Sequence, residues 1–258
     1  MKPILFHFGS FYVQSYYTFI TLGILLGIYF FYRYSKRSDF PVTYMLDVSI
    51  IVVATCYIGA RLFHIVFEQP QYYIQNPLEI FHIWKGGYVI YGGILFPLIF
   101  IYIYARRKGL DFLKITDLMA PATALGTALG RMACLFQGCC FGNPTHLPWA
   151  ITFPEGANGG LTPSHVPLHP TQIYLVLVNL AIFLVLNWRF KYKKFNGELT
   201  YWYLLLYAVG RSFVEIYRYD FRGDLFSPYL STSQFISLII LIITSFLLIK
   251  NYRKIKNA

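Results

Sequence analysis

The sequence is short of charged residues, which make up only 13% of its 258 positions. A soluble domain carries about a quarter. With 57% hydrophobic residues, the chain has too little polar material to cover a globule in water, so a membrane protein is expected instead. The net charge of +11 does not indicate a nucleic-acid partner, because the basic residues lie in short loops between apolar runs.

The sequence also has few cysteines and no recognisable linker. Its four cysteines do not suggest a secreted disulfide framework, since a bridge between the neighbours Cys139 and Cys140 would be strained. Residues 1–14 lack the short apolar region and cleavage site of a secretory signal, so the first span is expected to stay in the mature protein. Without internal repeats or low-complexity tracts, residues 1–258 are expected to form a single transmembrane domain.

Seven apolar runs are each close to the roughly 20 residues that cross a bilayer. They are expected near residues 15–33, 45–67, 87–105, 112–136, 171–189, 199–217 and 232–250. Of the 22 basic residues, 15 fall in alternate loops and the carboxyl-terminal tail. The opposite side holds only Lys2, Lys85, Arg218 and Arg222. The expected fold is therefore an all-α integral membrane protein with about seven helices, its amino terminus outside and its carboxyl terminus cytoplasmic.

Among the charged residues in these apolar runs, three arginines and one glutamate stand out as candidates: Arg61, Arg131, Arg211 and Glu215. Charged groups in membrane spans face a cavity or one another and are functional candidates. Three guanidinium groups against one carboxylate predict a positive cavity. Because the planar fork of arginine suits a phosphate ester, the expected ligand is an anionic phospholipid head group.

Each charged group also has a purely structural interpretation. Arg61 shares a helical face with His64 and, further out, Glu68, but an arginine snorkelling to the interface is the alternative. Arg131 follows the small-residue run GTALG, and its alternative role is to cap the carbonyls of a broken helix.

The residues Arg211, Glu215 and Arg218 follow the spacing i, i+4, i+7 and share one helical face. Glu215 is expected to neutralise one arginine and leave the other for a ligand. A structural ion pair within the membrane is the alternative.

The predicted outer-face loop, residues 138–170, contains no lysine or arginine and is rich in proline, glycine and histidine. A loop of this length in a compact domain is more often functional than a simple connector. His169 near its end is a candidate general base, or else a hydrogen-bonded residue at a helix start. Gln172 begins the span that follows.

Six stretches in this order resemble the prolipoprotein diacylglyceryl transferase family: IGARLF, WKGGYVIYGG, ITDLMAP, GRMACLFQGCCFG, LHPTQIY and GELTYWYLLLYAVGRSFVEIYR. The resemblance runs from about residue 15 to residue 250. It implies transfer of a diacylglyceryl group from phosphatidylglycerol to a cysteine thiol of a lipoprotein precursor, in the cytoplasmic (inner) membrane of a bacterium. The implied partners are phosphatidylglycerol or another anionic phospholipid, the precursor's signal peptide and the bilayer. No cofactor is expected.

The resemblance also implies a set of site residues. Arg131 matches the family's signature arginine, and Arg211 with Glu215 matches the pair of the penultimate span. Tyr207 and Tyr17 match tyrosines of the penultimate and first spans. The candidate catalytic residues are Arg131, Arg211, Tyr91 and His169. The candidate substrate-binding residues are Arg61, Tyr17, Glu215, Tyr207, Gln137, His64 and Gln172.

The sequence departs from the family pattern at several polar positions. Tyr91 stands where the family has a histidine, and a phenol is a poor base at neutral pH. Cys134, Gln137 and Cys139 replace two asparagines and a glutamate. His64 or His169 is the alternative proton acceptor.

The cysteines Cys139 and Cys140 have three interpretations. They are reactive thiols in an acyl or glyceryl transfer, metal ligands together with Cys134, or small residues at a tight turn. The spacing C-x4-C-C lacks the paired pattern of zinc sites, so no metal site is expected.

Two further function classes stay open beside the transferase. One is a non-catalytic or differently specific membrane paralogue that binds an anionic phospholipid or a partner helix, which the changes at Tyr91, Cys134 and Cys139 favour. The other is a transporter with an anion site at the bilayer midplane, which the absence of a detectable inverted repeat disfavours.

Overall fold

The structure is a computed structural model that describes residues 4–8, 11–83, 86–219 and 231–257. The all-α prediction is confirmed, because long helices make up most of the described chain. The named strands in this part form one short antiparallel hairpin, β1 (Ile4–Phe8) with β2 (Phe11–Gln14). Lys2, Lys85 and Arg222, which the charge pattern assigned to the outer side, lie outside the described residues.

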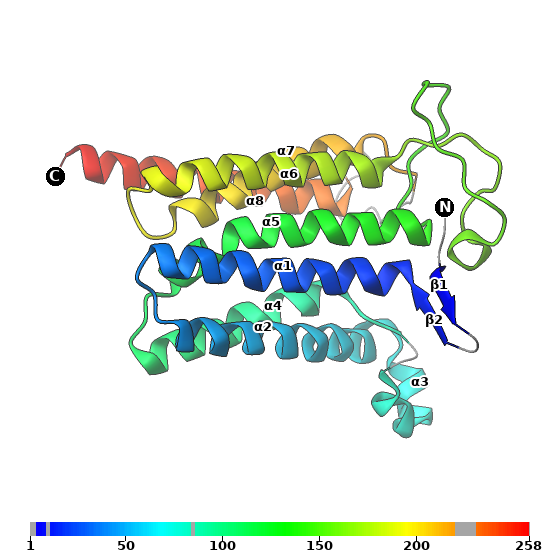
Figure 1. Cartoon of the computed structure of the whole chain (residues 1–258), viewed down its shortest axis with the longest axis horizontal. Helices are drawn as coiled ribbons and strands as arrows, with labels where there is room; N and C mark the ends of the chain where they lie inside the picture. The colour runs from blue at the N-terminus through cyan, green and yellow to red at the C-terminus, as the bar shows by residue number, and fades with distance from the viewer. Residues whose placement is uncertain (1–3, 9–10, 84–85, 220–230, 258) are drawn as a thin grey trace. The chain divides into compact units, whose positions relative to one another are not determined.

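The chain divides into two compact units, residues 32–115 and residues 1–31 with 116–258 (Figure 1). In chain order the helices are α1 (Ser15–Arg37), α2 (Val42–Phe63), continued by the π-helical turn η1 (His64–Glu68), α3 (Pro70–Gln75), the 3₁₀ turn η2 (Pro77–Phe81), α4 (Ile90–Lys108), α5 (Phe112–Gln137), the 3₁₀ turn η4 (Ala157–Gly160), α6 (Thr171–Arg189), the 3₁₀ turn η5 (Phe190–Tyr192), α7 (Glu198–Glu215) and α8 (Thr232–Lys256). Helices α1 and α5 contribute residues to both units.

Six of these helices are long and apolar enough to cross a membrane: α1, α2 with η1, α4, α5, α6 with η5, and α8. The chain is therefore a multi-pass membrane protein. The remaining predicted span, 199–217, forms α7, whose 18 residues include the charged side chains of Glu198, Arg211 and Glu215. A total of seven spans and the outside position of the amino terminus stay predictions.

Where the helices end has local causes. Helix α4 starts at Ile90, later than the apolar run predicted, because Gly86 and Gly87 adopt φ of +82° and +78°, which no helix continues. Helices α1 and α8 run several residues past their apolar runs. Their last turns hold lysine and arginine, which interact favourably with the terminal carbonyl groups.

In the unit of residues 32–115, α2 packs against α4. The crossing lies at Gly59 and Gly92, where a Cβ on either residue would collide with the backbone carbonyl of the other. Small residues at such a point let two membrane helices approach to backbone contact.

In the other unit, α7 packs against both α6 and α8. Its amino terminus is capped by Asp117 of α5, whose side chain is completely buried. The carboxylate of Asp117 accepts hydrogen bonds from the backbone N–H of Gly197 (2.7 Å) and of Thr200 (2.9 Å). Lys193 Nζ lies 3.2 Å from the same carboxylate. An anion at this position satisfies orphan N–H groups and the positive end of the helix dipole.

A second buried carboxylate, that of Glu198, joins α7 to its two neighbours. Its Oε1 accepts hydrogen bonds from Arg189 Nε of α6 and from the Tyr252 hydroxyl of α8, both at 2.7 Å. Two carboxylates therefore fix the start of α7, and with it the direction in which this helix carries Arg211 and Glu215.

Candidate functional site

The carboxyl-terminal end of α5 reverses the chain at Gly138, which has a φ of +85°. The N–H of Gly138 bonds to the carbonyl of Leu135 (3.2 Å), and the N–H of Cys139 bonds to the carbonyl of Cys134 (3.1 Å). This is the Schellman arrangement that ends many helices at a glycine. It turns the residue after the glycine back over the last helical turns, so Cys139 returns to Cys134.

The segment after this turn is held on both sides by backbone hydrogen bonds. Gly142 N–H donates to the carbonyl of His169 (2.9 Å), and Asn143 N–H donates to the carbonyl of Tyr217 (2.8 Å). A Cβ at Gly142 would collide with Tyr217, His169 and Thr171, so only glycine fits there. The loop after α5 thus runs between the start of α6 and the residues that follow α7.

Two side chains at the start of α6 also hold the cysteine pair. The hydroxyl of Thr171 donates to the carbonyl of Cys140 at 2.6 Å, and Nε2 of Gln172 donates to the carbonyl of Cys139 at 2.7 Å. Gln172 is completely buried, and its Oε1 has no hydrogen-bond partner among the described residues. Gln172 therefore positions the cysteine turn, and its expected part in substrate binding stays a prediction.

The charged residues of α7 form a cluster around Glu215. Its carboxylate pairs with Arg211, one turn earlier, and lies 3.7 Å from Arg218 Nε. The hydroxyls of Ser233 and Ser231 donate to Glu215 Oε1 at 2.6 Å and 3.2 Å. Both arginines lie near this one carboxylate, whose single charge can compensate only one of them, so the expectation that one arginine is left for a ligand stays a prediction.

Arg131 joins this cluster from α5. It is hydrogen-bonded to Tyr207 of α7, and both residues interact electrostatically with Arg211. The cluster thus combines the guanidinium groups of Arg131, Arg211 and Arg218 with the single carboxylate of Glu215. Arg211 and Arg218 are 6% and 7% exposed, so this excess of positive charge is buried. The expected grouping of Arg218 with Arg211 and Glu215 is therefore present in the structure, although Arg218 lies just beyond the end of α7.

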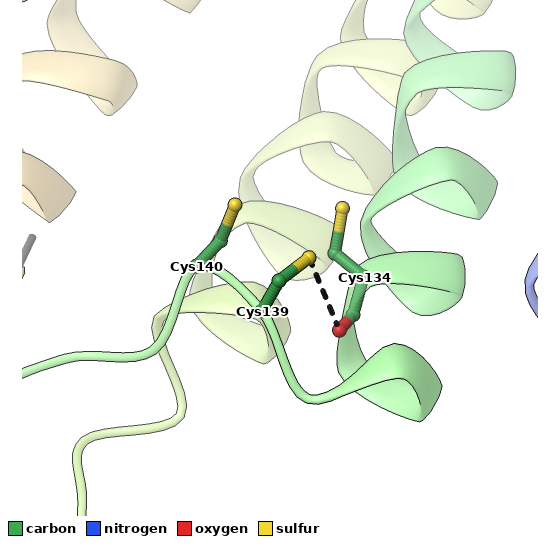
Figure 2. Close-up of side chains that lie close together, drawn as sticks. All are labelled: Cys134, Cys139 and Cys140. Atoms are coloured by element: carbon green, nitrogen blue, oxygen red, sulfur yellow. Dashed lines mark hydrogen bonds between the residues drawn. The ribbon is translucent and has the colours of Figure 1, made fainter. Parts of the chain in front are cut away.

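The three cysteines Cys134, Cys139 and Cys140 converge beside these arginines, and their sulfur atoms all lie within 4.8 Å of one another (Figure 2). Cys139 Sγ also contacts the carbonyl oxygen of Cys134 at 3.8 Å. Hydrogen bonds from the Cys134 and Cys139 thiols, together with the positive charges of Arg218 and Arg131, lower the pKa of Cys140 well below its ordinary value. The same network raises the pKa of Cys139, which acts as a donor.

The first span contributes a tyrosine that the sequence did not single out. Tyr16 of α1 lies close enough to Cys134 and Cys139 to interact with them electrostatically. Its neighbour Tyr17, the residue suggested by the resemblance, is 60% exposed and lines an open groove with β2. Adjacent residues on a helix point about 100° apart, so Tyr16 and Tyr17 face different neighbours. The resemblance to the family, which rests on the order of short stretches, does not distinguish between these two tyrosines.

Two further candidates of this unit occupy the loop between α5 and α6. Gln137, the exposed last residue of α5, lines a small pocket of about 140 Å³ together with residues 153–159. The imidazole Nδ1 of His169 lies 3.1 Å from the hydroxyl of Tyr174, which accepts a hydrogen bond from Trp149 Nε1 (2.8 Å). His169 is therefore part of a hydrogen-bonded aromatic cluster at the start of α6.

In the unit of residues 32–115, Arg61 binds backbone carbonyl groups of η2 and of the glycines that precede α4. Its guanidinium donates to the carbonyls of Gly86 and of Glu79 (2.8 Å) and lies over the ring of Tyr73, 5.3 Å from the centroid. Arg61 is only 7% exposed, so it does not snorkel to an interface. These carbonyl contacts give Arg61 a structural role, and its expected part in ligand binding stays a prediction.

The other two candidates of this unit lie before and after these carbonyl groups in the chain. His64 Nδ1 lies 2.6 Å from Glu68 Oε2, as expected for residues one turn apart on the same face. A Cβ at Gly87 would collide with the imidazole of His64, so this glycine lets the backbone approach the ring. Tyr91, in the first turn of α4, is 53% exposed.

Comparison with known proteins assigns the chain to a family. The sequence model of the family called prolipoprotein diacylglyceryl transferase matches residues 3–250. A relative from Clostridium tetani, named phosphatidylglycerol–prolipoprotein diacylglyceryl transferase, is 36% identical over 98% of this chain and 100% of its own length. A relative of the same name from Finegoldia magna is 39% identical over 91% of this chain and 89% of its own length. The chain therefore belongs to the prolipoprotein diacylglyceryl transferase family of membrane transferases.

Proposed function

We propose that the chain transfers the diacylglyceryl group of phosphatidylglycerol to the cysteine thiol of a lipoprotein precursor, and that Arg131, Arg211 and Arg218 stabilise the departing phosphate. The observation that carries this proposal is the buried pair Arg211 and Arg218 at the single carboxylate of Glu215, with Arg131 close enough to Arg211 to interact with it electrostatically. The names of the family relatives support the same reaction. Its setting is the bacterial cytoplasmic membrane.

The chemistry requires positive charge at one oxygen. The thiolate sulfur forms a bond to a glycerol carbon, and the bond between that carbon and the phosphate oxygen breaks. The electron pair of the broken bond stays on the oxygen of the departing glycerol phosphate. Fixed guanidinium groups, held in a desolvated site, stabilise this developing charge without having to reorganise.

The thiol proton of the acceptor must also be removed, and the two candidate histidines differ in their partners. His64 pairs through Nδ1 with the carboxylate of Glu68, whereas His169 pairs with the neutral hydroxyl of Tyr174. The assay below decides between them: His64→Gln or His169→Gln abolishes transfer if that imidazole is the proton acceptor.

The test is a transfer assay with purified protein in proteoliposomes. It measures incorporation of labelled diacylglycerol from phosphatidylglycerol into a peptide that carries a lipoprotein signal sequence and its cysteine. Because one removed donor in such a site costs on the order of 10²–10³-fold in kcat, Arg131→Gln and Arg211→Gln should each lose activity on this scale. Arg106→Gln is the matched control, since Arg106 is exposed and contacts only Tyr102 among the described side chains.

The same assay separates the transferase from the non-catalytic alternative. Transfer by the wild-type protein that survives in both Arg131→Gln and Arg211→Gln would refute the role of the arginines. No transfer by the wild-type protein, beside an active member of the family, would refute the transferase itself. Phosphatidylglycerol binding that still depends on Arg131 would then support a lipid-binding paralogue, which the replacements at Tyr91, Cys134 and Cys139 favour.

A further inference from the structure

The three cysteines Cys134, Cys139 and Cys140, in the unit of residues 1–31 and 116–258, have the geometry of a ligand set. Cys134 projects from the last turns of α5, and the reversal at Gly138 brings Cys139 and then Cys140 to the same place. Figure 2 shows the three thiols gathered where α5 ends. Cys140 takes a φ of +63°, unusual for a residue with a side chain, and the hydroxyl of Thr171 holds its carbonyl. The turn is therefore kept in a conformation that gathers the sulfurs.

The distances between the sulfurs are close to those of a metal thiolate site. Metal–sulfur bonds of about 2.3 Å place the ligands of a tetrahedral or trigonal site roughly 3.8–4.0 Å apart. The three sulfur atoms already lie within 4.8 Å of one another, so binding requires closure of the widest pair by about 1 Å or less. Small changes of side-chain rotation supply such a movement.

The kind of donor decides which cations fit. The cluster contains three thiols and, among the described residues, no histidine or carboxylate grouped with them. Thiolates select soft cations such as Cu⁺ and Zn²⁺, whereas Mg²⁺ and Ca²⁺ take oxygen ligands. Cu⁺ is satisfied by three thiolates. Zn²⁺ prefers four ligands and would need a further one from solvent.

The surrounding charge also favours this assignment. Three thiolates around Cu⁺ carry a net charge of −2, and around Zn²⁺ a net charge of −1. An anionic complex buried in a membrane protein needs nearby positive charge. The guanidinium groups of Arg218 and Arg131, which interact electrostatically with Cys140, supply it.

We propose that Cys134, Cys139 and Cys140 form a binding site for one soft, thiophilic cation, with Cu⁺ as the best fit and Zn²⁺ as the competitor. On binding, up to three S–H bonds break, their protons pass to solvent, and three metal–sulfur bonds form. No electron is transferred.

The site has a consequence for the transferase, and this part rests on the proposed function. The arginines that compensate the metal thiolate complex are those assigned to the lipid phosphate. A metal-loaded protein therefore offers less positive charge to phosphatidylglycerol. We expect metal binding to inhibit diacylglyceryl transfer, with the apparent KM for phosphatidylglycerol increased.

The test uses the full-length protein, purified in detergent and fully reduced. Cu⁺ and, separately, Zn²⁺ are titrated against a competing chelator, and the metal that stays with the protein is counted after gel filtration. The wild-type protein should retain one equivalent of Cu⁺. Cys134→Ser, Cys139→Ser and Cys140→Ser should each lose it, whereas Cys56→Ser, which changes the remaining cysteine in α2, should retain it.

A second measurement does not depend on the variants folding. The wild-type protein is alkylated with and without Cu⁺, and each cysteine is followed by mass spectrometry. Bound metal should protect Cys134, Cys139 and Cys140 and leave the labelling of Cys56 unchanged. Retention of neither metal, or equal protection of all four cysteines, overturns the site. One equivalent of Zn²⁺ without any of Cu⁺ keeps the thiolate site and overturns the assignment of Cu⁺.

The two proposals fail separately. Metal retention and alkylation report on the thiolate site even if the protein transfers no lipid at all. If the metal binds and transfer by the active protein is unchanged, the inhibitory link is refuted and the metal site stands.

Discussion

Replacing Asp117 tests how strongly the start of α7 is fixed. This buried carboxylate accepts hydrogen bonds from two backbone N–H groups, those of Gly197 (2.7 Å) and Thr200 (2.9 Å), and from the Thr200 hydroxyl (2.9 Å). Asp117→Ala leaves the two backbone donors without their acceptor at a buried position, and leaves the Thr200 hydroxyl, among the described residues, only Thr116 Oγ1, at 3.0 Å, as its acceptor. It also leaves Lys193, 3.2 Å from the carboxylate, without its counter-ion.

The size of the effect follows from these contacts. A hydrogen bond to a charged group contributes roughly 1.5–3 kcal/mol, but the three bonds share one carboxylate and are not additive. Removing one partner of a buried charged network costs about 3–5 kcal/mol, because the other groups stay buried and unsatisfied. We expect Asp117→Ala to lower the free energy of unfolding by about this amount. Asp117→Asn should cost less, since one amide oxygen still accepts from Thr200.

The matched control is Asp111→Ala, the same change at a surface cap. Asp111 accepts a hydrogen bond from the N–H of Leu113 at 2.9 Å in the first turn of α5, and water replaces it easily there. A cap of this kind is worth about 1 kcal/mol. Both variants are unfolded in mixed micelles with increasing amounts of denaturing detergent. Equal losses of stability for Asp111→Ala and Asp117→Ala would show that burial of the cap is not what matters.

Three other changes test separate contacts. Gly59→Ala, at the backbone contact of α2 with α4, should destabilise the protein by about 1–3 kcal/mol through overpacking. Gly27→Ala is the control: no atom lies within 4 Å of the added Cβ, so this change should be neutral or stabilising in the same unfolding assay. Glu198→Gln should lower the unfolding midpoint, because Arg189 and the hydroxyl of Tyr252, each at 2.7 Å, lose a charged acceptor. An unchanged midpoint would contradict this expectation. Thr171→Val should speed alkylation of Cys140, because it removes the 2.6 Å bond that holds the turn; equal rates measured by mass spectrometry would argue against that restraint.

The helices were predictable because a membrane imposes a simple length rule. Apolar runs predicted at 112–136 and 171–189 became α5 (Phe112–Gln137) and α6 (Thr171–Arg189). The short hairpin β1–β2 was not predicted, although the sequence Gly9-Ser10 between Phe8 and Phe11 is typical of a two-residue hairpin turn. The start of α4 was misplaced because Gly86 and Gly87 interrupt a run that is apolar enough to read as helix.

Part of the candidate site could be predicted from the rule that a charged residue within a membrane span is costly and therefore a functional candidate. That rule identified Arg131, Arg211 and Glu215 without any knowledge of structure, and the resemblance supplied a reaction that composition alone does not contain. The spacing i, i+4, i+7 added Arg218, which lies three residues beyond the last residue of α7 and still reaches the carboxylate of Glu215.

The convergence of the cysteines could not be read from their spacing alone. Cys134 and Cys139 are five residues apart, and no regular helix places such residues together. They meet because Gly138 ends α5 in a left-handed turn. A glycine four residues after a cysteine, at the end of an apolar run, was the available signal. Asp117 gave no signal of comparable strength, since its partners lie 80 residues away in the sequence.

The double pairing of Glu215 bears on the protein before a substrate arrives. Before any lipid is bound, Arg211 has a counter-ion one turn later on α7, and Arg218 has the same counter-ion three residues earlier in the chain. Neither arginine therefore needs a substrate for its charge to be partly compensated. In the proposed reaction, the phosphate of the lipid displaces the carboxylate of Glu215 from the arginines, and this carboxylate pairs with them again when the product leaves.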